Sequence, residues 1–240
     1  LRGLTVDALD ITPEMLENGN RAVTEFITLL KVLIAERRRK PGDFESDVLT
    51  RLIEGEKPTG EKSGEKLSET ELYHQCIFLL NAGHETTTNL IGNGVHALLT
   101  QRAQYERLVA ETALLPTAVE ELLRFESPLQ LNNRLATAPI DMPGFRIEAG
   151  CFITLAIGAA NRDPAAFDAP DALYIARKPN LHLAFGHGAH ACAGMNVARL
   201  EARVALAALA RRLPGLQLDG APERDARVRF RGFRRLPVKW

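Results

Sequence analysis

The sequence lacks any excess of charge of one sign. Its 240 residues carry 30 Lys and Arg against 30 Asp and Glu, which gives a formal net charge of +0. Binding to nucleic acid or to an anionic membrane surface requires a clear cationic excess. Long apolar runs are lacking too, because polar residues interrupt every apolar stretch well before the roughly 20 residues of a membrane span. We therefore expect a soluble protein with no nucleic acid and no membrane as partner.

Cysteine is scarce as well. The three residues Cys76, Cys151 and Cys192 are odd in number and include no CxxC pair. We expect no disulfide framework, and we expect a cytoplasmic location, because a reducing compartment suits such a chain. Neither a signal-peptide pattern nor Met stands at Leu1. No internal repeat indicates a solenoid, and 45% hydrophobic residues suffice for a substantial core.

Apolar residues at helical spacing predict most of the fold. A helix is expected from Thr12-Pro13 to the basic run at 37–40, where cations favour a last helical turn. A shorter helix is expected over 44–53. Residues 55–66 are rich in Gly, Glu, Lys and Pro without apolar periodicity, which is typical of a surface loop.

Ser68 and Glu71 form a capping box, which opens a helix predicted over about 68–99. At about 1.5 Å per residue this helix is long enough to cross a domain, so we expect it to be central and buried. Further helices are predicted over 116–126 and 195–213.

Strands are expected in two places. Residues 146–157, around Ala149-Gly150, predict a hairpin, and alternating Val228 and Phe230 indicate small terminal strands. The predicted fold class is mainly α with small β-sheets.

One cysteine stands in a segment suited to ligand binding. Residues 185–194 read FGHGAHACAG, with three glycines and Cys192 just before the last predicted helix. Glycines let a backbone approach a flat ligand closely, and a helix N-terminus stabilises an anion at the sulfur. Cys192 is thereby placed to act as a thiolate. Without the surrounding motif, an inert core cysteine would be the commoner interpretation.

Two further motifs stand on predicted helices. Residues 82–87 read AGHETT, a polar interruption in the longest helix that indicates a groove beside a ligand, with a solvated kink as the competing interpretation. Glu121 and Arg124 are three residues apart on one helix face, a spacing that permits an ion pair. In isolation, such a pair is usually a weak surface contact.

In this order, the three motifs resemble the cytochrome P450 family. The haem-binding signature of that family, F-G-x-G-x-H/R-x-C-x-G, is matched by Phe185, Gly186, Gly188, His190, Cys192 and Gly194. The resemblance implies haem b (iron protoporphyrin IX), with Cys192 as the iron ligand and metal-binding residue. It also implies cofactor contacts from His190, Arg134, Phe185, Gly186 and Gly83. His190 and Arg134 would contact the propionates.

The resemblance assigns further roles. Glu85 and Thr86 would be catalytic and assist proton delivery to dioxygen, while Glu121 and Arg124 would be structural. The chain would be the C-terminal portion of a single P450 domain over 1–240, lacking the N-terminal portion that supplies part of the substrate pocket in relatives. Asn161 and Arg162 match another stretch of the family and are expected to be structural.

The implied activity is that of a monooxygenase that inserts one oxygen atom of O₂ into an apolar or amphipathic organic substrate. Electrons would come from NAD(P)H through a ferredoxin or flavodoxin-type donor. A chain without its N-terminal portion could also be an apo helical scaffold without catalysis. A zinc site built on His187, His190 and Cys192 stays open as well, as does a thiol hydrolase with His190 as the base of Cys192.

Overall fold

The computed structural model describes residues 12–55 and 66–240. These residues form two compact units, one up to His84 and one from Glu85 onward. The long helix α3 (Glu69–Thr100) contributes residues to both units. Within the described stretches, no helix is both long enough and apolar enough to cross a bilayer.

The first unit contains α1 (Pro13–Arg39), α2 (Val48–Glu54) and the beginning of α3. The Thr12 hydroxyl caps α1 by accepting a hydrogen bond from the backbone N–H of Met15. A small core joins the three helices. Its buried members are Leu30, Ile34, Ile53 and Leu72.

The expected helix over 44–53 begins later than predicted, at Val48. Asp47 is the reason, because its carboxylate accepts hydrogen bonds from the N–H of Leu49 and the hydroxyl of Thr50, at 3.1 and 2.9 Å. An aspartate in this position stabilises a helix start. The surface loop expected over 55–66 lies outside the described residues, except for Gly55 and Lys66.

Helix α3 begins and ends within one residue of the predicted 68–99, but it is not buried throughout as expected, because Leu72 is its only buried residue over 69–89. The expected capping box is formed: Glu71 Oε2 accepts from the Ser68 N–H at 2.9 Å, and Ser68 Oγ accepts from the Glu71 N–H at 3.3 Å. Helices α5 (Leu115–Phe125) and α7 (Met195–Arg212) also lie within one residue of the predicted ranges.

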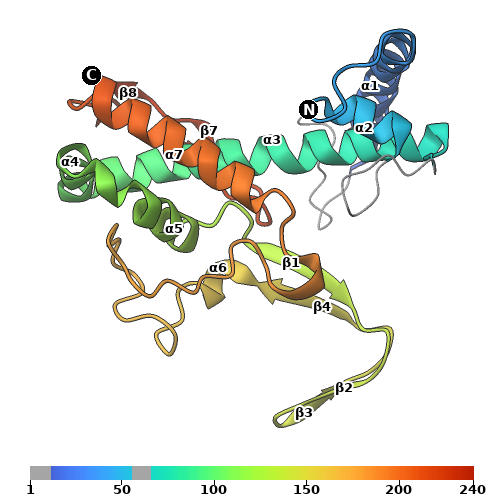
Figure 1. Ribbon diagram of the computed structural model, residues 1–240. Coiled ribbons are helices and arrows are strands. Elements are labelled where there is room, and N and C mark those ends of the chain that lie inside the picture. The colour runs from blue at the N-terminus through green and yellow to red at the C-terminus, as the bar shows by residue number, and fades with distance from the viewer. Residues whose placement is uncertain (1–11, 56–65) are drawn as a thin grey trace. The chain divides into compact units, whose positions relative to one another are not determined.

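Two helices were not predicted, α4 (Arg102–Ala110) and the single turn α6 (Ile157–Ala160). The second unit has a core built from α3, α4, α5 and α7, and α5 packs against α7. A Cβ at Gly94 on α3 would lie 3.0 Å from the Leu122 side chain on α5, so these two helices approach closely. Figure 1 shows α4, α5 and α7 beside the same half of α3.

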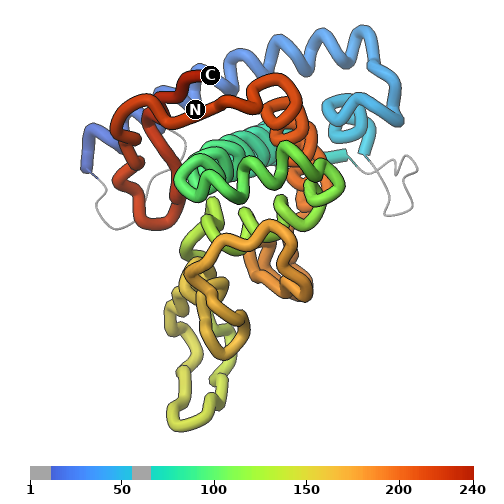
Figure 2. Tube along the Cα trace, turned by 90° about the vertical axis from the view of Figure 1, so that its left-hand side faces the viewer, coloured from blue at the N-terminus to red at the C-terminus, as the bar shows by residue number. Residues whose placement is uncertain are grey.

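The described strands form two-stranded antiparallel sheets. The pairs are β1 (Leu131–Leu135) with β4 (Phe152–Ala156), β2 (Ile140–Met142) with β3 (Phe145–Ile147), β5 (Gln217–Leu218) with β8 (Val238–Lys239), and β6 (Glu223–Arg224) with β7 (Phe233–Arg235). The β2–β3 hairpin extends away from the helices of its unit (Figures 1 and 2). A mainly α fold with small sheets is thereby confirmed.

The hairpin predicted over 146–157 is wrong. Its two strands, β3 and β4, do not pair with each other but with β2 and β1. Gly144, with φ +86°, makes the turn between β2 and β3. At Gly150 the chain instead turns toward β1, because the Gly150 N–H donates to the carbonyl of Ala136 at 2.7 Å.

The terminal strands are also displaced from their predicted place. Phe230 forms only an isolated bridge with Leu129, and the strands lie on either side of it, as β6 and β7. The Asp225 N–H donates to the Gly232 carbonyl at 3.0 Å, which closes the β6–β7 ladder before it reaches Val228.

Candidate functional site

The cysteine loop, residues 185–194, is shaped by its glycines. Gly186 and Gly188 have φ of +70° and +79°, in the left-handed region that residues with a Cβ rarely adopt. A 3₁₀ turn follows at Gly188–His190. The Cys192 N–H then donates to the Phe185 carbonyl at 2.9 Å, which closes the loop three residues before α7 begins.

The Cys192 side chain is exposed at the end of this loop. Apart from its immediate chain neighbours, no atom of the described chain lies within 4 Å of the position that a Cβ on Gly188 would take. A Cβ on Gly194 would lie 4.0 Å from the Cys192 Sγ, in ordinary van der Waals contact with the sulfur. The loop therefore offers an accessible sulfur with little beside it, and these residues fit a flat ligand such as haem.

The other predicted propionate and loop residues are accessible as well. His190 is exposed at the end of the 3₁₀ turn, and Arg134 is half-buried on β1, where it donates to the Asn133 carbonyl at 2.9 Å. The zinc interpretation gains no support. Among the described residues, no three His, Cys, Asp or Glu side chains gather as metal ligands.

The predicted pair on α5 is fully buried. Glu121 is 0% and Arg124 1% exposed, and two hydrogen bonds of 2.8 and 2.9 Å join the guanidinium to the carboxylate. Arg124 also donates to the backbone carbonyls of Asn161, Pro170 and Ala172, at 2.9, 2.8 and 3.1 Å. The pair therefore anchors the segment that follows β4 and is not a surface contact.

Three further groups converge on Glu121. The Arg177 Nε donates to its two oxygens at 3.0 and 3.2 Å, the Asn180 amide at 3.1 Å and the Tyr174 N–H at 2.9 Å. Sequence reasoning missed Arg177, because more than 50 residues separate it from Glu121 and no local pattern marks it. The buried carboxylate is thus satisfied by two arginines and two neutral donors.

Asn161 connects this pair to the start of the cysteine loop. It is 0% exposed, its side-chain oxygen accepts from the Leu183 N–H at 2.7 Å, and its amide donates to the Ser127 hydroxyl at 2.8 Å. Its backbone carbonyl is an acceptor of Arg124. These contacts agree with the structural role expected for Asn161.

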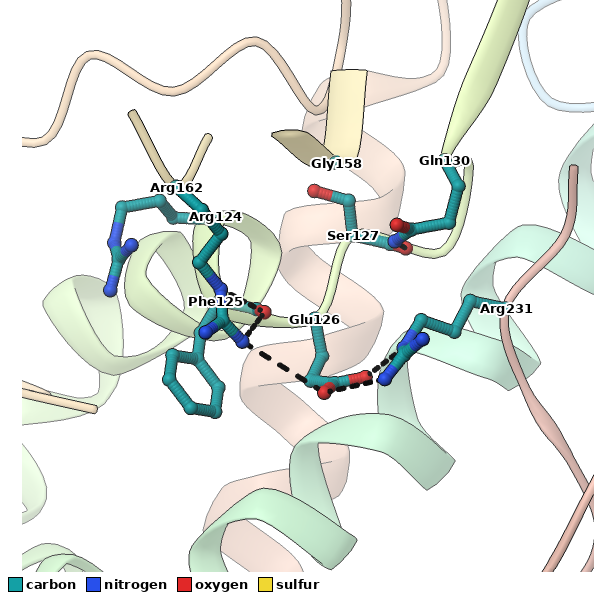
Figure 3. A pocket seen from close by; sticks show the side chains of 8 residues that line it. All are labelled: Arg124, Phe125, Glu126, Ser127, Gln130, Gly158, Arg162 and Arg231. Atoms are coloured by element: carbon teal, nitrogen blue, oxygen red, sulfur yellow. Dashed lines mark hydrogen bonds and ion pairs between the residues drawn. The ribbon is translucent and has the colours of Figure 1, made fainter. Parts of the chain in front are cut away.

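A cavity of about 250 Å³ lies at the C-terminal end of α5 (Figure 3). Figure 3 shows Arg162 and Arg231 on two sides of Glu126. Arg231 binds the carboxylate at 2.6 Å, and Arg162 binds the Phe125 carbonyl at 2.6 Å. Groups of the protein already bind both guanidinium groups. The residues around the cavity therefore have a structural role, which is to hold the C-terminal segment against the end of α5.

The polar interruption of α3 does not kink or end the helix. No neighbouring segment of the described chain lies within 4 Å of a Cβ placed on the exposed Gly83. Glu85 is ion-paired with Arg227, which also binds Asp225 at 2.9 Å. Thr86 is half-buried in the same turn of the helix. Sequence reasoning missed Arg227, which lies 142 positions after Glu85.

Burial lowers the pKa of Arg227, but its hydrogen bonds to Glu85 and Asp225 outweigh burial and raise that pKa. The guanidinium therefore stays charged and holds the Glu85 carboxylate on one side.

The comparisons with known proteins agree on one family. The family model described as cytochrome P450 matches residues 5–215. The chain is 41% identical to the biotin biosynthesis cytochrome P450 of Bacillus subtilis (strain 168), over 97% of the chain and 58% of that protein.

Two solved structures are similar to the fold. The first is P450BioI in complex with hexadec-9Z-enoic acid ligated acyl carrier protein, with a TM-score of 0.88 and 40% identity over 96% of this chain and 57% of that one. The second is CYP109E1 from Bacillus megaterium in complex with corticosterone, with a TM-score of 0.87 and 32% identity over 99% and 63% of the two chains. The chain thus spans little more than half the length of these relatives.

Proposed function

Because the chain belongs to the cytochrome P450 family, we propose that its site is that of a haem-thiolate monooxygenase, with Cys192 as the axial ligand of haem b. The observation that carries the proposal is the exposed Cys192 sulfur at the end of a glycine-shaped loop before α7. When bound, the haem iron supplies the activation of dioxygen, and thiolate ligation favours O–O cleavage.

The residues of the loop would hold the cofactor. Gly186 keeps the loop in a conformation that leaves the sulfur open, and Phe185 lies beside it with its carbonyl bonded to the Cys192 N–H. His190 and Arg134 have accessible side chains suited to the two propionates, since cations bind carboxylates with charge-assisted hydrogen bonds.

On α3, Gly83 leaves the space in which a ligand can approach the helix. Glu85 and Thr86 would pass a proton toward the reacting oxygen, with the Glu85 carboxylate as the group that exchanges it and the Thr86 hydroxyl as donor. Arg227 is ion-paired with that carboxylate and holds it in place. Glu121 and Arg124 play a structural part behind the site.

We propose an apolar or amphipathic organic substrate and a ferredoxin or flavodoxin-type electron donor in the cytoplasm. The substrate class is supported by the relatives, whose solved complexes contain a fatty acyl chain and a steroid. Because the chain spans little more than half of its relatives, the activity is proposed for the whole protein. We expect the 240 residues alone to lack normal turnover.

The test is the spectrum of the reduced chain with carbon monoxide, after expression with a haem precursor. We expect the red-shifted Soret band of a thiolate ligand in the parent and its loss in Cys192→Ala. Cys151→Ala is the matched control, because Cys151 is also exposed and free. A thiolate band that survives in Cys192→Ala, or that is lost in Cys151→Ala, would refute Cys192 as the ligand.

A further inference from the structure

A second carboxylate on α5 binds the helix that follows the cysteine loop. Glu120 accepts hydrogen bonds from the Nε and Nη2 of Arg199, both at 2.8 Å, in the bidentate geometry that makes such pairs strong and directional. His182 Nε2 is a third partner of this carboxylate, at 3.1 Å. The pair is half-buried, so it is screened less than an exposed one. Arg199, in the second turn of α7, is thereby fixed to α5.

The same guanidinium lies against the first residue of the loop. The Arg199 Cζ is 4.7 Å from the centroid of the Phe185 ring, within the range of a cation–π contact. The His182 ring is 6.1 Å from the Phe185 ring. The Phe185 carbonyl accepts a hydrogen bond from the Cys192 N–H. A contact that fixes Phe185 therefore also fixes the backbone of Cys192.

The electrostatics support a permanent positive charge at this place. Hydrogen bonds to Glu120 and attraction to its charge raise the pKa of Arg199 against the effect of burial. Burial raises the pKa of Glu120, but hydrogen bonds with His182 and Arg199 outweigh it and lower that pKa to about 2. Both partners are therefore charged at neutral pH.

We propose that Arg199, held by Glu120, is a positioning residue of the cysteine loop, which fixes the Phe185 ring and keeps a positive charge near the Cys192 sulfur. Neighbouring carboxylates of α5 thus have separate tasks. Glu121 anchors the segment after β4, and Glu120 anchors the loop and α7. The ordering of the loop does not depend on the cofactor, whereas an effect on haem iron rests on the proposed function.

The first experiment measures hydrogen exchange of the amides of residues 185–194 in the chain without haem. Arg199→Ala should speed exchange of the Cys192 amide about tenfold, which corresponds to about 1.4 kcal/mol of local stability. Arg203→Ala is the matched control, because Arg203 lies one turn further along α7 and its Nε donates to the Arg199 carbonyl at 3.2 Å. Unchanged exchange in Arg199→Ala would overturn the proposal.

Glu120→Gln is a second variant that tests the same proposal if Arg199→Ala does not fold. It keeps the shape of the side chain and removes the charge that holds Arg199. It should speed exchange of the loop amides in the same direction, with amides in the middle of α3 unchanged. Uniformly faster exchange throughout the unit would indicate global destabilisation and count against a positioning role.

The second experiment measures the midpoint potential of the haem-loaded chain. A cation near a thiolate stabilises added negative charge, so Arg199→Ala should have a more negative potential than the parent and Arg203→Ala. Arg199→Lys keeps the charge without the planar fork, so it should restore the potential but not the slow exchange. Equal potentials in all variants would refute the electrostatic part.

The two proposals fail in different ways. If the haem-loaded parent shows no thiolate band, the proposed function is refuted for this chain, while the hydrogen-exchange result on the chain without haem stays valid. A normal thiolate band with unchanged exchange and potential in Arg199→Ala sinks the positioning role alone.

Discussion

The buried pair on α5 and the cysteine loop before α7 differ in what satisfies their polar groups. Glu121 and Arg124 bind groups of the chain itself, from the carbonyls after β4 to the side chain of Arg177. The loop, by contrast, bonds its own backbone and leaves the Cys192 side chain exposed. The polar groups of the pair are satisfied within the fold, whereas the loop leaves an accessible sulfur at its end.

This difference matters for stability. A buried charge that loses its partner is costly, because water cannot replace the lost contacts. An exposed thiol loses little when it is replaced, because water already surrounds it. Substitutions should therefore destabilise the pair strongly and the loop weakly, although the loop carries the proposed chemistry.

The largest effect is expected at the pair itself. Glu121→Gln keeps the shape but leaves Arg124 and Arg177 without their buried anion, so the free energy of unfolding should fall by about 3 to 5 kcal/mol. Urea denaturation followed by circular dichroism measures it. Asp141→Asn, which breaks the exposed pair with Arg146, should change it by less than about 0.5 kcal/mol. Similar losses in both variants would contradict the comparison.

Protonation of Glu120 at low pH should have a smaller effect on the free energy of unfolding. Glu120 lies on α5 and binds Arg199 on the helix after the cysteine loop, so it links the two regions. Its pKa is about 2 in the folded chain and ordinarily 4.5. Because the folded pKa is depressed, its stabilisation is present above 4.5 and is lost as the pH falls toward about 2. Urea unfolding at about pH 6 and about pH 3 should show a larger loss in the parent than in Glu120→Gln.

The control for this pH dependence is Glu106→Gln, which removes a carboxylate from an exposed pair with Arg102. That variant should keep the acid sensitivity of the parent. Identical acid sensitivity of the parent and Glu120→Gln would show that Glu120 contributes nothing to it.

The backbone of the loop should give a third, modest effect. Gly186→Ala places a Cβ on a residue with φ +70°, which costs about 1 kcal/mol in the free energy of unfolding. The cost is conformational, because the nearest atom, the His190 carbonyl oxygen, is 3.9 Å from that Cβ. Gly215→Ala is the control, since its φ is ordinary and its Cβ site is open. Equal urea midpoints for the two variants would argue against strain at Gly186.

The smallest effect on the chain without haem is expected at Cys192. Cys192→Ala should change the unfolding free energy by less than about 0.5 kcal/mol, as surface substitutions do. Added haem should raise the melting temperature of the parent, because a ligand of the folded state stabilises it, and raise that of the variant less. A variant that is strongly destabilised without haem would show that the sulfur has a packing role.

Local patterns predicted the long elements and the motifs. The capping box of Ser68 and Glu71 and the apolar periodicity placed α3 within one residue, since both depend on neighbours in sequence. The glycines and Cys192 of residues 185–194 likewise form one continuous segment, so its composition indicated the loop. The family was recognised from such segments and is confirmed by the comparisons.

The pairing of the strands could not be predicted from the sequence. Residues 146–157 contain two real strands, β3 and β4, yet their partners were misassigned, because a turn residue such as Gly150 does not reveal which strand the chain will meet. The partners of the charged residues were hidden for the same reason. Arg177, Arg199 and Arg227 are ordinary arginines in the sequence, and each meets its carboxylate across more than 50 positions.

The sequence by itself determined most of the helices, the cysteine loop and the three-residue spacing of Glu121 and Arg124, because these depend on a few adjacent residues. Only the tertiary structure decided that the pair is buried, that Glu120 holds Arg199 against Phe185, and that Arg227 holds Glu85. Burial and ion pairing between distant segments depend on the packing of whole helices, and that packing brings together charges that no local pattern connects.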